Sequence, residues 1–311
     1  MYYKGLMPVT KTEKKGSLTI YTVDKRMDDK QAENLGNKFV TPSMIDFIIK
    51  DDADVFTTEG KLLLRFRKGA LSKDHADQFY DNVIDFAETP TSNRGSTSGS
   101  QSKNVYDNPK IMSNIIGFFD RFPPNYKISF KKAGIKAPLE VRECRFNRDC
   151  PEKFEKLIPL VKEINTLYKK YTPEYFERQN NKAKQTFFKI ADTSFTTITT
   201  NVNFRTSIHK DKGDDMEGFG NLAVIENGKY EGAETCFPQY GIGVDVRTSD
   251  IIFMDVHEWH GNLPMKPIDK DAKRLSIVCY LRYKLWFRTK NKPRRFYERH
   301  NKTIRKLTRK K

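Results

Sequence analysis

Two side chains that commonly bind metal ions stand two residues apart within TTNVNFRTSIHKDKGDD, residues 199–215. They are His209 and Asp211, and the alternating, threonine-rich run before them predicts a strand. Residues i and i+2 of a strand face the same way, so this spacing directs an imidazole and a carboxylate to one point. Together they supply two ligands of the two-histidine, one-carboxylate set that holds Fe(II). The same spacing also fits an ordinary ion pair on a surface turn.

A third ligand and an anion-binding group stand further along, in DIIFMDVHEWHGNLPMK (250–266) and RLSIVCYLR (274–282). The first stretch predicts a strand followed by His257 and His260, and either imidazole could complete the set. Arg274 opens the next predicted strand, and Ser276 follows it on the same face. A guanidinium binds a carboxylate through two parallel hydrogen bonds, and a nearby hydroxyl adds a third. A metal that chelates an α-keto acid at one end, with Arg274 holding the carboxylate at the other, accounts for this order of residues.

The elements that must position these residues are short strands backed by helices. Residues 149–171 carry an apolar stripe at helical spacing, Pro159 is expected to kink that helix, and a second helix begins at Thr172-Pro173. The Asn227-Gly228 pair predicts a hairpin turn. From residue 188 onward the apolar period changes to two, and we predict strands at 194–208, 220–226, 234–237, 243–246, 250–256 and 275–283. This order predicts an α+β fold: a double-stranded β-helix core, that is, a cupin-like jelly roll, with supporting helices.

The strand predicted over 194–208 has a consequence for its polar residues. If it is regular, alternation places Asn201, Asn203 and Arg205 on the same face as His209. One of them, with Asn203 as our choice, is then expected to help bind the keto acid. The alternative is that these polar side chains face water.

The composition excludes several other kinds of protein. Apolar residues make up 37% of the 311 and charged residues 31%, while an aromatic content of 12% opposes wholesale disorder. Four scattered cysteines without a CxxC pair exclude a zinc ribbon and do not favour a disulfide scaffold. No apolar run approaches the length of a membrane span, and no charged-then-apolar leader follows Met1. We therefore expect an intracellular protein, cytoplasmic or nuclear, that does not cross a membrane.

Basic residues are concentrated at the carboxyl end. The net charge is +17, and residues 284–311 hold 13 Lys or Arg and one acid, a net of +12. We predict one domain over 1–283, with a mobile Ser/Thr/Gly-rich loop at 89–104, and a basic tail over 284–311. Such a tail favours a polyanion through counterion release, and its interleaved aromatics suit stacking on bases. A solvated, partly helical tail is the alternative.

These motifs resemble a known family, the TET and base-J-binding-protein (JBP) group of 2-oxoglutarate and Fe(II)-dependent dioxygenases. The resemblance covers about residues 188–282, more faintly from 151, and is carried by RTSIHKDKGD, NGKYEGAETCFPQYGIGVDV, DIIFMDVHEWHGNLPMK and RLSIVCYLR. It implies His209, Asp211 and His260 as iron ligands. His260 is preferred to His257 because EWHGNLPMK is the stretch that matches the family's distal histidine. It also implies Arg274 and Ser276 for 2-oxoglutarate.

The resemblance further implies a substrate and the residues that contact it. Members oxidise the 5-methyl group of 5-methylcytosine or thymine in nucleic acid, by ferryl hydrogen abstraction and hydroxyl rebound. The target base in DNA must be flipped out or single-stranded. Tyr280 falls where an aromatic ring stacks on the base. Asp214 and Arg282 fall where TET proteins carry an asparagine and a histidine. This difference leaves open which base, 5-methylcytosine or thymine, is the target. A monomer is expected.

Three alternatives remain at this point. A protein hydroxylase acting on prolyl or lysyl side chains shares the fold and the ligand pattern. A basic nucleic-acid-binding module without catalytic activity would make the histidines incidental. Tyr280 could be a core aromatic of an inward-facing strand.

A hairpin after Tyr230 is expected to place Phe237 or Tyr240 over the cofactor pocket.

Overall fold

The computed structural model describes residues 9–91, 95–98, 111–135 and 138–308. Most of the predicted mobile loop (92–94 and 99–104) and the last residues of the predicted tail (309–311) therefore lie outside the described part. The chain forms two compact units. The first comprises residues 1–114, 200–212 and 219–278, and the second comprises 115–199, 213–218 and 279–311. The boundary falls within three strands: β6 (Met112–Phe119), β8 (Thr197–Val202) and β16 (Lys273–Tyr280).

A large mixed sheet is the main layer of the first unit. Its strand order is β1-β2-β4-β5-β13-β9, followed by the first-unit parts of β16, β8 and β6. The strands not yet bounded are β1 (Val9–Lys15), β2 (Leu18–Val23), β4 (Ala53–Thr57), β5 (Leu62–Arg67), β13 (Ile251–Met254) and β9 (Gly220–Asn227). Their neighbours are antiparallel at β4–β5, β5–β13 and β13–β9, and parallel at β2–β4.

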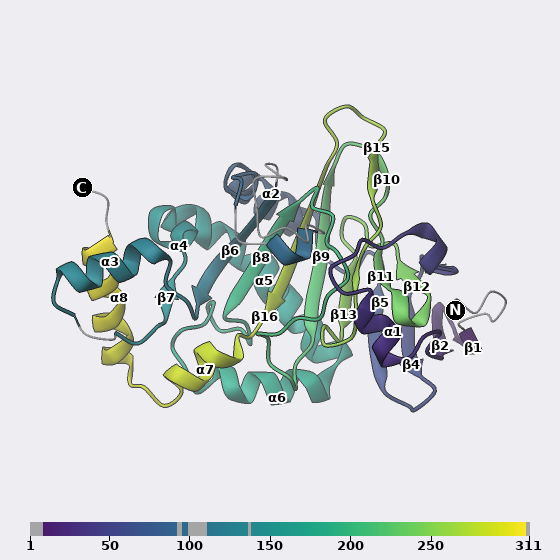
Figure 1. Cartoon of the computed structure of the whole chain (residues 1–311), viewed down its shortest axis with the longest axis horizontal. Coiled ribbons are helices and arrows are strands. Elements are labelled where there is room, and N and C mark those ends of the chain that lie inside the picture. Colours follow the sequence, from purple (N-terminus) through teal and green to yellow (C-terminus); the bar gives the residue numbers. More distant parts are fainter. Residues whose placement is uncertain (1–8, 92–94, 99–110, 136–137, 309–311) are drawn as a thin grey trace. The chain divides into compact units, whose positions relative to one another are not determined.

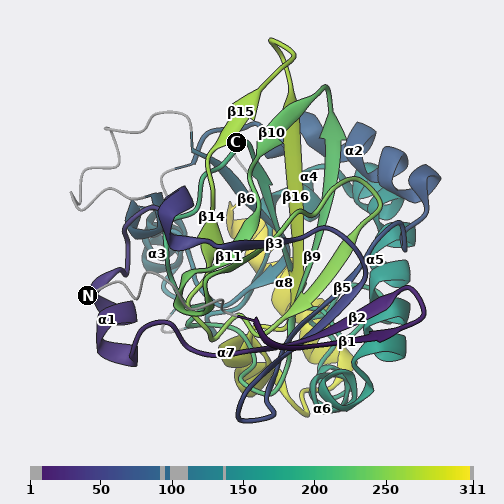
Figure 2. The same cartoon turned by 90° about the vertical axis from the view of Figure 1, so that its right-hand side faces the viewer.

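A smaller sheet lies over this one, as Figure 2 shows. Its order is β14-β11-β12-β3, with bounds Gly261–Asn262, Thr235–Phe237, Ile242–Val244 and Phe47–Ile49. Inward side chains from both layers form one buried cluster, with Leu64, Phe66 and Ile252 from the large sheet and Phe237 and Ile242 from the small one. Two sheets that enclose an apolar core are the predicted jelly roll, and the α+β fold class is confirmed.

Two helices with side-chain caps belong to the first unit. In α1 (Asp29–Asn34) the Asp28 carboxylate accepts from Gln31 N–H, and Gln31 accepts from Asp28 N–H in return. In α2 (Lys73–Ala87) the Ser72 hydroxyl accepts from His75 N–H. The buried face of α2 contacts β9. Short 3₁₀ turns lie at Pro42–Met44, Gly95–Ser98 and Pro238–Tyr240.

The second unit is mainly helical. It contains the remaining parts of β16, β8 and β6, the short β7 (Arg142–Glu143), and the helices α3 (Pro124–Lys132), α4 (Arg145–Asp149), α5 (Pro151–Tyr171), α6 (Pro173–Ala183), α7 (Tyr283–Thr289) and α8 (Arg294–Thr308). The predicted helix over 149–171 is thus found as α5, and it continues through Pro159 without a break. The kink at Pro159 stays a prediction. Within the described ranges, no helix is both long and apolar enough to cross a membrane.

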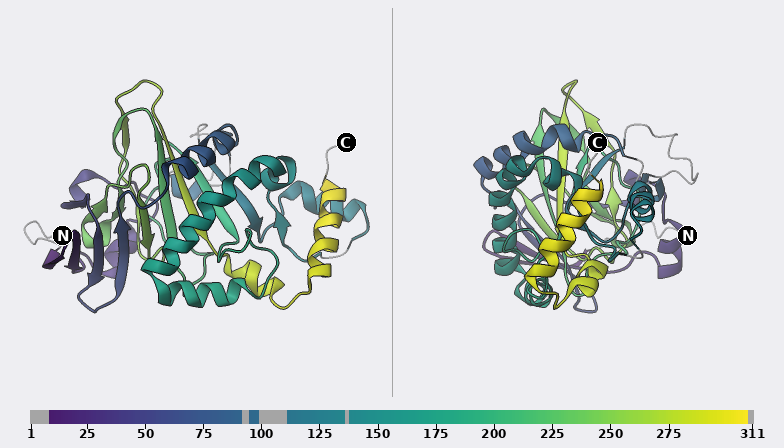
Figure 3. Two further views of the ribbon diagram at one scale, coloured as in Figure 1. Left: turned by 180° about the vertical axis from the view of Figure 1, so that it is seen from behind. Right: turned by 90° about the vertical axis from the view of Figure 1, so that its left-hand side faces the viewer.

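The basic tail contributes packed structure to the second unit. Leu285 of α7 and Phe296 and Tyr297 of α8 pack with Phe118 and Phe188. Ile304 packs with Phe122, Tyr126 and Phe130, so that α8 lies beside α3 (Figure 3). The apolar face of α8 is therefore covered. The division into a domain over 1–283 and a tail over 284–311 stays a prediction.

Two local predictions are wrong. The strand predicted over 194–208 ends at Val202, because Asn203 adopts a left-handed backbone with φ of 49°. The strands on either side of Asn227-Gly228 do not pair as a hairpin. Instead β10 (Tyr230–Gly232) pairs with β15 (Met265–Pro267), the arm at the top of Figure 1.

Candidate active site

Backbone hydrogen bonds anchor the two segments that carry the predicted metal ligands. His209 N–H donates to the His260 carbonyl and His260 N–H donates to the His209 carbonyl, both at 2.9 Å. This single antiparallel bridge joins residues 51 positions apart. Asp211 N–H donates to the Val256 carbonyl at 2.9 Å. The H-x-D segment is therefore a loop fastened to the segment after β13, rather than the end of a long strand.

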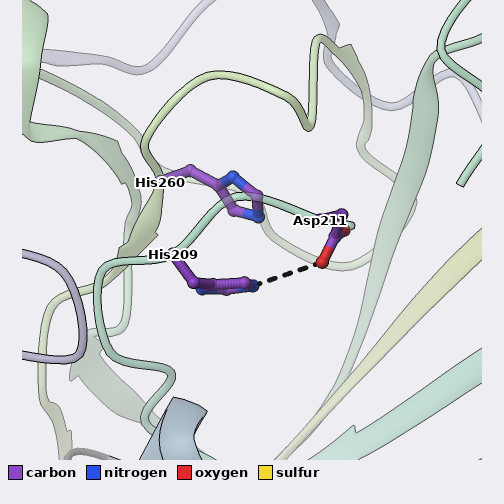
Figure 4. Close-up of side chains that lie close together, drawn as sticks. All are labelled: His209, Asp211 and His260. Atoms are coloured by element: carbon purple, nitrogen blue, oxygen red, sulfur yellow. Dashed lines mark ion pairs between the residues drawn. The ribbon is translucent and has the colours of Figure 1, made fainter. Parts of the chain in front are cut away.

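The three side chains converge on one point. Ligand atoms of His209, Asp211 and His260 all lie within 4.8 Å of one another. The His209 Nε2 atom is 3.5 Å from the Asp211 Oδ1 atom, and the two imidazole centroids are 4.3 Å apart. Figure 4 shows the three side chains turned toward one another. Two imidazoles and one carboxylate are a donor set that suits Fe(II).

Both imidazoles are oriented by a backbone carbonyl. The His209 Nδ1 atom lies 2.7 Å from the Ser207 carbonyl, and the His260 Nδ1 atom lies 2.9 Å from the Glu258 carbonyl. When each Nδ1 carries the proton and donates it there, each Nε2 lone pair is available to a metal. Burial, together with the His209 imidazole, lowers the pKa of His260 to about 4. His260 is therefore neutral near pH 7, which is the form that binds metal.

His257 contacts the backbone of the cluster and is not one of its three side chains. Its N–H donates to the Asp255 carboxylate at 2.9 Å, and its Nδ1 atom lies 3.1 Å from the Asp211 carbonyl. Of the two candidate histidines, His260 is the one that the structure brings into the cluster with His209. His257 instead contacts the backbone of a predicted ligand.

Arg274 is the predicted anchor for the keto acid. It is 5% exposed, and its Nε and Nη2 atoms have no hydrogen-bond partner among the residues that the structure describes. Burial lowers its pKa, but a guanidinium stays charged at neutral pH. Nε and one Nη form an edge of the guanidinium that pairs with both oxygens of a carboxylate. An unsatisfied edge on a buried cation therefore fits a carboxylate ligand.

Ser276 and the polar residues of β8 and its end form hydrogen bonds of their own. The Ser276 hydroxyl accepts from Asn201 Nδ2 at 3.3 Å, and Asn201 Oδ1 lies 2.6 Å from the Ser113 hydroxyl. Asn203 uses its amide on the backbone: it accepts from Arg274 N–H at 2.7 Å and donates to the Ala272 carbonyl at 3.0 Å. It therefore fixes the start of β16. Direct contact between Asn203 and the keto acid stays a prediction.

The predicted alternation from Asn201 to His209 is not found. Asn203 ends the strand through its left-handed backbone, and the chain leaves the sheet after it. Arg205 donates to the Val40 carbonyl at 2.7 Å and stacks on the Phe39 ring at 4.3 Å. Arg205 thus joins the H-x-D loop to the segment before residue 42.

The three predicted substrate residues belong to the second unit, where Arg282 is the centre of a charged group. Its guanidinium lies 2.9 Å from Asp120 and 3.7 Å from Asp214, and it stacks on the Phe119 ring at 4.7 Å. Burial opposes the charge of Arg282, but Tyr280, Asp120 and Asp214 raise its pKa.

Tyr280 is 7% exposed, and its hydroxyl lies 3.0 Å from the Thr199 hydroxyl. The structure thus joins Asp214 to Arg282 and leaves the ring of Tyr280 largely buried in the strand.

Sequence reasoning missed several supporting residues. Asp120 precedes Arg282 by 162 positions, and Lys61 precedes Glu258 by 197. The Lys61 ammonium binds the Asp255 and Glu258 carboxylates at 2.6 and 2.7 Å, which braces the segment between β13 and His260. No local pattern could have identified these pairs. Of the two aromatics expected over the pocket, Phe237 has its ring centroid 6.4 Å from that of His260.

Taken together, the first unit offers three metal-binding side chains and one buried cation with an unsatisfied edge. Nε2 of His209, Nε2 of His260 and the Asp211 carboxylate fit Fe(II), while Arg274 fits the far carboxylate of a keto diacid. The residues present therefore suit an Fe(II) and 2-oxoglutarate pair.

Comparison with known proteins agrees with this donor set. Residues 127–283 match the family model Tet_JBP, described as the oxygenase domain of the 2OGFeDO superfamily. A bifunctional helicase and thymine dioxygenase JBP2 from Trypanosoma cruzi (strain CL Brener) is 26% identical over 254 residues, which cover 78% of this chain and 21% of the relative. A thymine dioxygenase JBP1 from Trypanosoma brucei brucei is 29% identical over 203 residues, 65% of this chain and 22% of the relative.

Similarity to a solved structure supports the fold. That structure is NgTET1 in complex with 5mC DNA, with a TM-score of 0.51 and 14% identity over 88% of this chain and 99% of that chain. The chain spans about a fifth of the length of the two curated relatives. The resemblance predicted from the motifs is confirmed, and the family match begins at residue 127, before the expected start at 151.

Proposed function

Because the chain belongs to the Tet_JBP oxygenase family, whose cofactors are Fe(II) and 2-oxoglutarate, we propose that it oxidises the 5-methyl group of a pyrimidine base in DNA. The observation that carries this proposal is the convergence of His209, Asp211 and His260 in the unit that also holds the unsatisfied Arg274. Thymine dioxygenases among the relatives support a 5-methylpyrimidine as the target.

Each residue of the site has a distinct role in this proposal. Fe(II) and 2-oxoglutarate, when bound, supply the oxidising chemistry that a strong C–H bond requires. His209 and His260 hold the metal through Nε2, and Asp211 holds it through its carboxylate. Arg274 binds the far carboxylate of 2-oxoglutarate, and Ser276 adds a hydroxyl beside it. None of these residues has to move a proton.

The base contacts are proposed for residues of the second unit. A methyl group inside a duplex is shielded, so the nucleotide has to be flipped out or single-stranded. Tyr280 is proposed to replace the lost stacking. Arg282 donates to a pyrimidine carbonyl and Asp214 accepts from an amino group or a ring N–H. Since Arg282 already binds Asp120, this acid is expected to hold the guanidinium in place.

A basic face on α8 is proposed to bind the DNA backbone. Arg295, Arg299, Lys302 and Lys306 are exposed and follow the spacing i, i+4, i+7 and i+11, which places them on one stripe of the helix. The opposite side of α8 is the packed side that carries Phe296 and Ile304. Four exposed cations on one side of a helix whose other side is packed can bind phosphates. Phosphate contacts position a protein on DNA without reading the base sequence.

The salt dependence of DNA affinity tests this face. Changing Arg295, Arg299, Lys302 and Lys306 to Gln should reduce the slope of log affinity against log salt by about 3.6, at about 0.9 for each lost phosphate contact. A matched control changes four exposed lysines of α5, namely Lys153, Lys156, Lys162 and Lys169, which removes the same charge. Equal slopes for the two variants would move the DNA-binding surface elsewhere.

Activity is tested by product analysis. Protein loaded with Fe(II) and 2-oxoglutarate without oxygen is mixed in air with DNA containing thymine and 5-methylcytosine, and the nucleosides are analysed by mass spectrometry. We expect a hydroxymethylated pyrimidine and a matching amount of succinate, both absent in His209→Ala. Succinate without any modified nucleoside would support oxygenase activity but would reject DNA as the substrate.

The proposal also covers the assembly and location of the protein. All three metal ligands and Arg274 come from one chain, which supports a monomer as the active form. A DNA substrate supports an intracellular location. Size-exclusion chromatography with light scattering, at the concentrations used for the activity measurement, tests the monomer.

A further inference from the structure

Tyr230 opens β10 as a buried residue that neither the metal ligands nor Arg274 account for. It is 6% exposed and packs with Ala233, Ala272 and Met265. Ala272 stands two residues before Arg274, so the tyrosine lies against the start of the strand that carries the keto-acid anchor.

The ring of Tyr230 is held rigidly from its other side. The Arg247 guanidinium lies over it at 4.5 Å and donates to the Tyr230 carbonyl at 3.3 Å. Arg247 is held in turn by the Glu226 carboxylate at 3.2 Å and the Asp245 carboxylate. A tyrosine fixed in this way presents its hydroxyl at one defined place.

The hydroxyl at that place is unsatisfied. Within the described residues, Tyr230 Oη has no hydrogen-bond partner, and neither have Nε and Nη2 of Arg274. The Glu226 carboxylate lies nearby, and its oxygens accept from Arg247 at 3.2 Å and from Thr248 N–H at 2.7 Å. Buried donors without acceptors are costly, so their grouping indicates a ligand that supplies acceptors.

The electrostatics agree with a shared environment for Tyr230 and Arg274. Burial raises the pKa of Tyr230 to about 12, so its hydroxyl remains protonated and can donate. Burial lowers the pKa of Arg274, while the neighbouring Tyr230 raises it. The two side chains are therefore close enough to interact.

We infer that Tyr230 is a second donor to the far carboxylate of 2-oxoglutarate. Nε and Nη2 of Arg274 bind the two carboxylate oxygens side by side, and the Tyr230 hydroxyl donates to one of them as a third bond. This inference rests on the proposed function, because it needs 2-oxoglutarate as the ligand. It makes Tyr230 a residue that selects keto diacids over keto acids without a second carboxylate.

The test compares two ligands on two variants. Anaerobic calorimetry with Mn(II) in the metal site measures the affinity for 2-oxoglutarate and for 2-oxobutyrate, which has no second carboxylate. Tyr230→Phe keeps the ring and its contacts with Arg247. We expect it to weaken 2-oxoglutarate about tenfold or more, as for a lost hydrogen bond to a charged group, and to leave 2-oxobutyrate unchanged. Tyr21→Phe, on β2 beside Phe47, is the matched control and should change neither.

The outcomes separate this inference from the proposed function. If wild-type protein shows no metal-dependent binding of 2-oxoglutarate, both are overturned. If wild-type binding is normal and Tyr230→Phe binds 2-oxoglutarate equally well, only the inference fails. It also fails if the variant weakens both ligands by the same factor, since that is the signature of a structural role. The unliganded variant should unfold at or above the wild-type temperature, because it removes a buried hydroxyl that has no hydrogen-bond partner in the described structure.

Discussion

Replacement of Arg274 by Met should strengthen the unliganded fold and abolish tight binding of 2-oxoglutarate. In the unliganded protein the guanidinium is 5% exposed and two of its nitrogen atoms lack partners in the described structure. Removing an unsatisfied buried polar group relieves about 1–3 kcal/mol. The free energy of unfolding of Arg274→Met should therefore equal or exceed that of the wild type.

The loss of binding follows from the same two atoms. Two hydrogen bonds to a charged group contribute about 1.5–3 kcal/mol each, so their loss should cost about 3–6 kcal/mol. At about 1.4 kcal/mol for each factor of ten, the dissociation constant for 2-oxoglutarate should rise about 100-fold or more. Urea unfolding measures the first effect, and the rise in melting temperature with added 2-oxoglutarate and Mn(II) measures the second.

Arg67 provides a matched control, for which the expected change in the free energy of unfolding has the opposite sign. It is 7% exposed, but it binds Asp54 at 2.7 Å and donates to the Ala53 and Phe66 carbonyls. Arg67→Met should destabilise the protein by about 3–5 kcal/mol, because it breaks a buried ion pair. An Arg274→Met protein that loses stability as Arg67→Met does, or that keeps its affinity for 2-oxoglutarate within threefold, would refute the assignment of Arg274.

Three further changes test other parts of the site and the fold. His257→Ala removes the contact with the Asp211 carbonyl and should lower Mn(II) affinity about tenfold or more in equilibrium dialysis. Gly213→Ala would place a methyl group 2.0 Å from the Arg282 Nη1 atom, so it should reduce oxidation of DNA and leave 2-oxoglutarate affinity unchanged. Burial lowers the pKa of His300 in the folded protein, so on acidification the unfolded chain binds a proton at a higher pH than the folded protein does. The stability of the fold should therefore fall as the pH drops below about 6.5. His300→Gln should flatten this fall in thermal unfolding.

Each of these changes also has an outcome that would contradict it. Unchanged Mn(II) affinity in His257→Ala would make that histidine irrelevant to Asp211. Normal DNA oxidation by Gly213→Ala would show that the position of Arg282 does not matter to the substrate. A His300→Gln protein as acid-sensitive as the wild type would place the titrating group elsewhere.

The chemistry of the site could be predicted from the sequence because its residues stand at short, characteristic spacings. His209 and Asp211 are two apart, and Arg274 and Ser276 share a strand face. The choice of His260 over His257 needed the family resemblance. The structure brings His260 beside His209 through a two-bond bridge, which no spacing indicates. The contacts of Asp120 and Lys61 could not be predicted, since each crosses more than 150 residues of chain.

The errors in the fold also have physical causes. The period of two continues past Val202, but Asn203 adopts a left-handed backbone that asparagine tolerates better than most residues, and the strand ends there. Asn227-Gly228 signals a tight turn, yet pairing partners are set by the sheet, and β10 pairs with β15.

The aromatics interleaved with the charges of the tail, which suit stacking on bases, include Phe296 and Tyr297. His300 follows Phe296 by four residues, and Ile304 follows Tyr297 by seven. These helical spacings place the four side chains on one face of α8, and that face packs inside the second unit. The basic charge remains exposed on the other side of α8.

The central claim is that one ferrous ion is bound jointly by His209, Asp211 and His260. Anaerobic equilibrium dialysis against Fe(II) in the presence of 2-oxoglutarate measures it directly, with His75→Ala on α2 as the control for loss of a histidine. One iron per chain is predicted for the wild type and the control, and a loss of tight binding in each of the three single alanine variants. Stoichiometric iron in all three variants would contradict the claim.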